Sequence, residues 1–100
     1  MAISASEKKY LQALLDSMGE ITLQYRDCED EVDKVKIKEK YRELTDKYKK
    51  LVDDLLTSDL SFSQKDIDAI NAIGVEISNA SKLQQLLISI AKLAAKFIVA

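Results

Sequence analysis

The acidic run between residues 27 and 33 is the densest group of side chains that could hold a metal ion. Asp27, Glu29 and Glu31 lie at alternate positions, like the first ligands of a helix–loop–helix calcium site. Such a loop requires glycine at its sixth position and a bidentate glutamate at its twelfth. This chain has Val32 and Lys38 there. The run therefore fails as a calcium loop, and we predict no metal site.

Catalytic groups are equally sparse. The chain has no histidine, which excludes Ser-His-Asp and Cys-His catalysis and histidine-ligated metals. A Ser-x-x-Lys spacing occurs at 6–9 and at 89–92, without the companion motifs of acyl-transfer enzymes. The two glycines, Gly19 and Gly74, are isolated, so there is no glycine-rich phosphate loop. We predict a protein that is not an enzyme, with no cofactor and no small-molecule substrate.

Charge is distributed in two blocks. Residues 27–33 carry five acids and no cation, and residues 34–50 carry eight cations against three acids, although the whole chain has a net charge of only −2. Opposite blocks of this kind can orient a protein partner during encounter, whereas the neighbouring acids disfavour nucleic acid. We therefore predict that Glu29, Asp30 and Glu31 contact a partner protein.

The single cysteine and the first residues bear on the compartment. Cys28 is alone, so no disulfide can form within the chain. The first nine residues lack the basic start and apolar run of a signal peptide. We expect a cytoplasmic protein, or one exported by a route that needs no such peptide.

Two apolar stripes with alternating three- and four-residue spacing predict two long helices. The first stripe consists of Leu11, Leu14, Met18, Ile21, Tyr25, Cys28, Val32 and Val35, and the second of Ile37, Tyr41, Leu44, Tyr48, Leu51 and Leu55. The stripes are two residues out of phase, so we predict a connection near residues 27–30, where Asp30 and Asp33 have capping-box spacing. The tyrosines on these stripes either pack in the core or face a partner.

Serines mark the other helix starts. Ser4 or Ser6 could cap the first helix, and Ser63 with Asp66 predicts a helix from about Gln64, with Phe62 placed for a hydrophobic staple to Ile67. A weaker break at residues 79–81, where Ser81 and Gln84 have capping-box spacing, would start another helix. The alternative is one helix from Gln64 to near the end of the chain.

Residues 82–100 are apolar on most sides. The plain interpretation is the central helix of a bundle, with surplus apolar surface that contacts a partner. We accordingly predict Leu93, Phe97 and Ile98 as partner-binding residues. The alternative is membrane action, since 19 helical residues rise about 28 Å, close to the thickness of bilayer hydrocarbon.

These observations predict an all-α fold, a three- or four-helix antiparallel bundle or helical-hairpin assembly, with residues 1–100 forming one domain. The expected function is a non-catalytic interaction module, such as an adaptor, a secretion chaperone or an inhibitor of the immunity-protein type. Its partner would be another protein, or a second copy in a homo-oligomer. The alternative is a membrane-active protein that uses residues 82–100.

Overall fold

Serine capping boxes begin two of the helices in the computed structural model, which describes residues 3–57 and 61–97. Helix α1, Ala5–Asp27, starts after Ser4, whose hydroxyl accepts the Glu7 N–H at 3.2 Å while the Ser4 N–H donates to Glu7 Oε1 at 2.8 Å. Helix α3, Gln64–Asn79, starts after Ser63 with the same reciprocal pair to Asp66. Each box satisfies amide groups that no helical carbonyl can reach. The predicted start at Gln64 is confirmed, and Ser4 rather than Ser6 caps α1.

The predicted break near residues 27–30 is also confirmed. Helix α2, Glu31–Thr57, follows a short connection, and the Asp33 N–H donates to Asp30 Oδ1 at 3.0 Å. The assignment of Val32 and Val35 to the first stripe is wrong, because α1 ends before them. In α2 they lie on the outer side and are 64% and 55% exposed.

The last helix is shorter than predicted. Helix α4, Leu83–Ala94, passes into a 3₁₀ turn, Ala95–Phe97, and the break at 79–81 is real. The Ser81 hydroxyl and amide bond to Gln85 Oε1 at 3.2 and 3.1 Å, so Gln85 takes the role expected of Gln84. Within residues 3–57 and 61–97, no helix combines the length and apolar character needed to cross a membrane.

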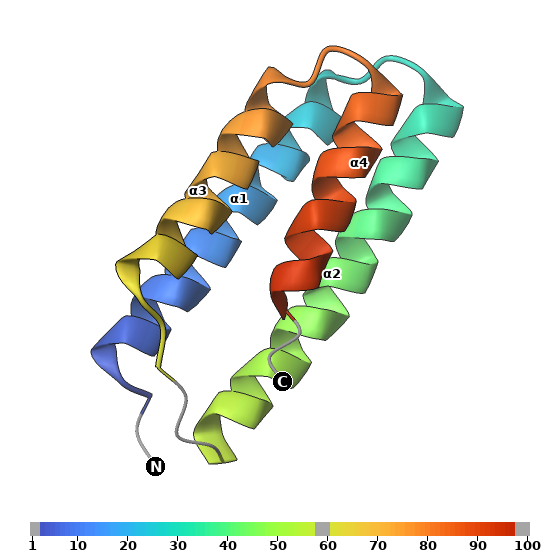
Figure 1. Ribbon diagram of the computed structural model, residues 1–100. Coiled ribbons are helices and arrows are strands. Elements are labelled where there is room, and N and C mark those ends of the chain that lie inside the picture. The colour runs from blue at the N-terminus through green and yellow to red at the C-terminus, as the bar shows by residue number, and fades with distance from the viewer. Residues whose placement is uncertain (1–2, 58–60, 98–100) are drawn as a thin grey trace.

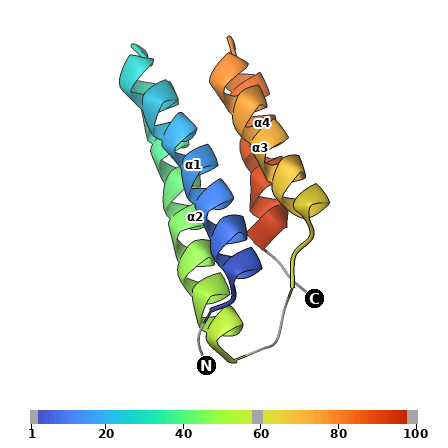
Figure 2. The ribbon, with the colours of Figure 1, turned by 90° about the vertical axis from the view of Figure 1, so that its left-hand side faces the viewer.

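The helices form two antiparallel hairpins, α1–α2 and α3–α4, which lie against each other as two layers (Figures 1 and 2). Between the layers, helices that run in the same direction are neighbours. Ser17 bonds to Ile70 and Gln24 bonds to Ile77, both at a separation of 53 residues, and a constant separation means that α1 and α3 run parallel. The prediction of an all-α, three- or four-helix antiparallel bundle or helical-hairpin assembly is confirmed for the described residues, with antiparallel helices within each hairpin and the parallel neighbours α1 and α3 between them.

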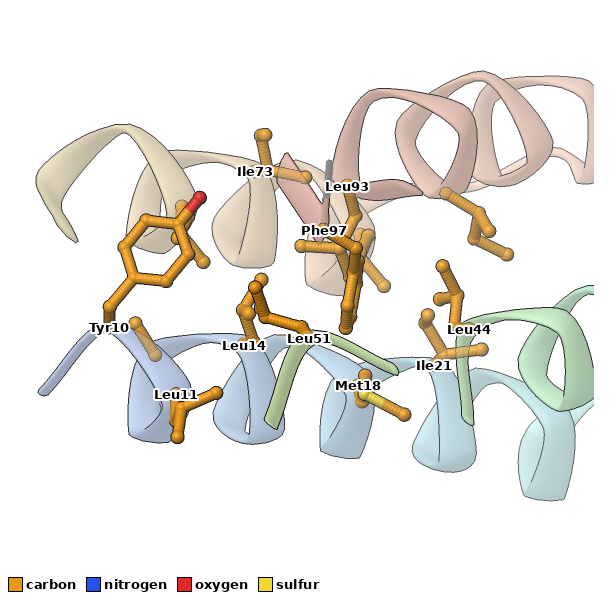
Figure 3. Close-up of a cluster of buried hydrophobic side chains, with 14 of the residues drawn as sticks. Tyr10, Leu11, Leu14, Met18, Ile21, Leu44, Leu51, Ile73, Leu93 and Phe97 are labelled. Carbon is orange, nitrogen blue, oxygen red and sulfur yellow. The ribbon is translucent and has the colours of Figure 1, made fainter. Parts of the chain in front are cut away.

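Apolar side chains from every helix fill the space between the layers (Figure 3). The most completely buried include Leu14, Ile21, Ile37, Leu44, Leu51, Leu55, Ile70, Ile77, Ile90 and Leu93. Complete burial of one such side chain stabilises the fold by about 1.5–3 kcal/mol relative to leaving it in water. These residues are the periodic positions of the stripes, which explains why the helices have these faces inward.

Tyr10 joins three segments at the end of the bundle opposite the two hairpin connections. Its hydroxyl donates to the Lys96 carbonyl at 2.6 Å, and its ring stacks on Phe62 with centroids 3.8 Å apart. Burial, with a smaller contribution from the Asp66 carboxylate, raises the pKa of Tyr10 above its usual value. Phe62 thus packs on Tyr10 of α1. The sequence predicts only the local staple between Phe62 and Ile67, not this contact with another helix.

Candidate functional site

The predicted acidic contact residues lie together at one end of the molecule. Glu29 and Asp30 belong to the α1–α2 connection and Glu31 begins α2, and all three side chains are exposed. The structure thus leaves this acidic turn accessible to another molecule.

The predicted apolar contact residues lie elsewhere. Leu93 is fully buried and Phe97 is 5% exposed, with the Phe97 ring set edge-on to Tyr48 at 6.5 Å between centroids. Both belong to the core because α4 and its 3₁₀ turn fold onto α2, so the apolar surplus is used inside this chain (Figure 3). Ile98 lies outside the described residues.

Carboxylates do not gather into a metal site in the described part of the chain. The one carboxylate with a completely buried, unpartnered oxygen there is Glu7, whose Oε2 has no hydrogen-bond partner among the described residues. Its other oxygen belongs to the capping box with Ser4. A single carboxylate with no second acidic ligand does not suit a divalent cation.

A groove of about 350 Å³ runs along the outer side of the α1–α2 hairpin, and we call it the tyrosine groove. It is lined by Ile21, Thr22, Tyr25, Ile37, Lys38 and Tyr41. Buried Ile21 and Ile37 form its floor, and the exposed side chains of Thr22 and Lys38 stand at its rim. Tyr25 and Tyr41 are half-buried and pack on the core. The floor of the groove is therefore mostly apolar and its rim is polar.

Cations border this groove on α2. Lys34 places its ammonium 5.0 Å from the centre of the Tyr25 ring, within range of a cation–π contact, and Lys38 lines the groove itself. Lys49 lies three helical turns after Lys38 and therefore on the same side of α2. None of these lysines forms an ion pair with a described residue.

The facing border on α1 carries apolar and cationic side chains. Leu15 and Lys8 lie two and four turns before Thr22, so they continue its side of the helix. Leu15 is 41% exposed, and Lys8 is exposed as well. The surface beside the tyrosine groove thus offers apolar contact area with positive charge along both edges.

The other side of α1 is occupied by α3. There the groove, about 220 Å³, is lined by Asp16, Ser17, Glu20, Asn71, Gly74, Val75 and Ser78. Its floor is a direct contact in which buried Ser17 donates to the Ile70 carbonyl at 3.2 Å. A side chain at Gly74 would place its Cβ 2.8 Å from Ser17 Oγ, so glycine permits the approach of the two helices. This acidic groove is shallow because the backbones meet beneath it.

Sequence reasoning missed Thr22, Lys38 and Leu15 as surface candidates. The available signal was the pair of tyrosines on the stripes of two helices, for which a partner-facing role was one alternative. Comparisons of the chain with known protein families, with curated proteins and with solved structures found no match. Function must therefore be argued from the surface itself.

Proposed function

We propose that this protein is a non-catalytic interaction module that binds another protein through the outer face of the α1–α2 hairpin. The observation that carries the proposal is the tyrosine groove, where half-buried Tyr25 and Tyr41 lie over buried isoleucines and beside Lys38, which forms no ion pair with a described residue. Tyrosine is enriched at protein interfaces, because its ring buries apolar area while its hydroxyl stays polar, and a lysine at the rim can steer a charged partner.

The surroundings of the groove support binding rather than catalysis. Among the described residues, the lining of the groove contains no carboxylate, thiol or serine, and its polar groups are one threonine, one lysine and two tyrosine hydroxyls. An adaptor, a secretion chaperone and an inhibitor all need only a complementary surface, so the three remain versions of one proposal. The acidic turn of Glu29, Asp30 and Glu31 lies at the end of the same hairpin and serves as a second contact.

The membrane alternative is not carried forward as a second candidate. It was motivated by the apolar character of residues 82–100, and Leu86, Ile90 and Leu93 of that segment are buried against the other helices. No described feature of the α4 surface favours a lipid over a protein partner.

The test is affinity capture from cells that naturally produce the protein, with mass spectrometry and sedimentation of the captured complex. The informative variant is Leu15→Gln, which alters the bordering surface at a half-exposed position. Val75→Gln on α3 is its control, because Val75 is also exposed and lies on the opposite side of α1. We expect the wild type and the Val75 variant to retain the same partner and the Leu15 variant to lose it. Equal retention by all three proteins, or a monomer that retains nothing at micromolar concentration, would contradict the proposal.

A further inference from the structure

We infer that the tyrosine groove receives an acidic amphipathic helix of the partner protein. This inference rests on the proposed function and specifies the chemistry of the partner at that site. It follows from three properties of the described residues: the row of lysines beside the groove, the composition of the groove's floor, and the acidic turn at the end of the hairpin.

Charge complementarity is the first argument. Lys34 and Lys38 border the groove on one side of α2, and Thr45 and Lys49 continue that side of the helix beyond it. Of the acids of α2 between these lysines, Glu39 and Glu43 lie on its other sides, and Asp46 is a neighbour of Lys49, three residues before it. A partner with carboxylates facing this edge gains three attractive contacts, and a basic partner meets repulsion.

The floor of the groove accounts for the apolar half of the partner. Ile21 and Ile37 are buried, and Tyr25 and Tyr41 present ring surface above them. The floor spans about 6 Å of the α2 axis, from Ile37 to Tyr41, and the row of lysines from Lys34 to Lys49 extends along about 22 Å of the same helix, at 1.5 Å per residue. The lysine row matches about four turns of a helix laid along the hairpin, which inserts apolar side chains where it crosses the groove.

The acidic turn sets the end of the site. Glu31 lies about one turn before Lys34 on the same side of α2, and Glu29 and Asp30 precede Glu31 in the connection. The acidic helix of the partner is repelled there, so this helix ends near Lys34, and the acidic turn contacts a different, cationic part of the partner. A long polyanion such as nucleic acid would cross this turn, and an anionic membrane would meet the exposed acids of the same hairpin.

A second copy of this chain fits the groove less well than a separate acidic helix. A two-fold dimer through this face would oppose the lysine edges of the two copies, and like charges across an interface weaken it. The acidic residues Asp16 and Glu20 lie on the other side of α1, so pairing them with the groove of another copy would give an open chain of molecules.

The experiment measures binding of a labelled synthetic peptide by fluorescence anisotropy. The probe is a helix of about 18 residues with leucine at every third or fourth position and glutamate on both flanks, and its control replaces each glutamate by lysine. We expect the acidic peptide to bind and the basic one not to bind. The affinity of the acidic peptide should fall as salt rises, because the lysine edges are exposed.

Matched charge reversals on α2 locate the site. The double variant Lys38→Glu, Lys49→Glu should lower the affinity for the acidic peptide by about tenfold or more and allow the basic peptide to bind. Lys36→Glu with Lys50→Glu changes the net charge equally on the other side of the same helix and should weaken the acidic peptide less than about threefold. Far-ultraviolet circular dichroism of each variant verifies that the helices are intact.

Three kinds of result would overturn the inference. One is equal binding of acidic and basic peptides, or equal loss in both pairs of variants. Another is a different occupant: dimers at micromolar concentration that Leu15→Gln dissolves, or binding to anionic vesicles that Lys38→Glu abolishes. If neither peptide binds while the natural partner is still captured and lost with Leu15→Gln, the inference fails and the proposed function stands.

Discussion

The two sides of α1 differ in how closely the neighbouring helix approaches. Toward α3, Ser17 and Gly74 bring the backbones together, and side-chain hydrogen bonds reach the carbonyls of the facing helix. Toward α2, bulky Tyr25 and Tyr41 stand between the helices and leave the tyrosine groove beside them. Small residues close one side, and large residues keep the other side open.

The comparison separates the residues that hold the hairpins together from those that remain available to another molecule. Side chains in the closed contact are already satisfied inside the chain, so changes there should act on stability. Side chains on the open side are exposed beside the groove, so substitutions there should change the affinity for a partner. The following predictions test that division, starting with the largest expected effect on stability.

Gly74→Ala should destabilise the protein by about 2 kcal/mol, because the new Cβ would lie 2.8 Å from the oxygen of a buried serine. Gly19→Ala is the control, since a Cβ at Gly19 meets nothing within 4 Å and alanine favours helix, which should stabilise by about 0.5–1 kcal/mol. Urea unfolding of both variants measures the two free energies. Effects of the same sign would mean that α1 and α3 are less closely packed than the structure has them.

The same contact predicts a specific rescue. In a Ser17→Ala background the closest remaining neighbour of the Gly74 Cβ is the Cβ at position 17, at an ordinary distance of 3.5 Å. Gly74→Ala should then cost less than about 0.5 kcal/mol, giving a coupling energy above about 1 kcal/mol in the double-mutant cycle. Additive effects would place the strain at some other neighbour.

Gln24→Ala should destabilise by about 1–2 kcal/mol. Its amide donates to the Ile77 carbonyl at 2.8 Å, which also accepts the Ala80 N–H at 3.3 Å, and to the Ala80 carbonyl at 3.0 Å. Gln12→Ala is the matched control, because Gln12 bonds only to exposed Asp16 on its own helix and should cost about 0.3 kcal/mol. Thermal unfolding followed by circular dichroism compares them, and a similar loss in both would remove Gln24 from the closed contact.

On the open side, Leu15→Gln should change the free energy of unfolding by less than about 1 kcal/mol. Leu15 is 41% exposed, so little apolar area leaves the core when it is replaced. Urea unfolding measures this, together with the capture experiment described above. A loss of unfolding free energy as large as that of Gly74→Ala would show that the outer face of the hairpin is needed for folding. The two sides of α1 would then not differ in their effect on stability.

The smallest effect concerns the start of α3. The backbone N–H of Ser63, then its hydroxyl, and to a lesser degree Lys96 and Lys65 hold the pKa of Asp66 below its ordinary value of 3.8. A lower pKa in the folded chain means that this carboxylate stabilises the protein above about pH 4 and loses that contribution as the pH falls further. Asp66→Asn should therefore be less stable than wild type at pH 7 and closer to it at pH 3, as measured by unfolding at both values. If the difference in unfolding free energy between wild type and Asp66→Asn were the same at pH 7 and pH 3, the pKa of Asp66 would not be lower in the folded chain than in the unfolded chain.

The helix boundaries could be predicted because their causes are local. Ser63 and Asp66 exchange hydrogen bonds three residues apart, and so do Ser4 and Glu7, so the pattern alone implies the contact. The apolar stripes were predictable for the same reason, since helical periodicity determines which residues share a face. Val32 and Val35 were misplaced because the spacing continues across a connection that carries no glycine or proline.

The surface could not be predicted in the same way. Leu93 and Phe97 are apolar in either location, and only the packing of α4 against α2 shows that the core takes them. Lys38 belonged to a basic run that a solvated helix explains, and it became a candidate only when Tyr41 on its own helix and Tyr25 on α1 were found beside it. Composition records how much apolar surface exists but not which part another helix covers.

By itself the sequence determined the apolar stripes of the helices, the capped start near Gln64, the connection near residues 27–30 and the absence of histidine chemistry, since these depend on residue types and on spacings of a few residues. Tertiary structure alone decided that the two hairpins pack with parallel neighbours, that one side of α1 is closed at Gly74 and that the other is left as a groove. These features depend on contacts between residues about fifty positions apart, such as Ser17 with Ile70. Which helix faces meet across that distance is set by the fit of small and large side chains, which periodicity does not specify.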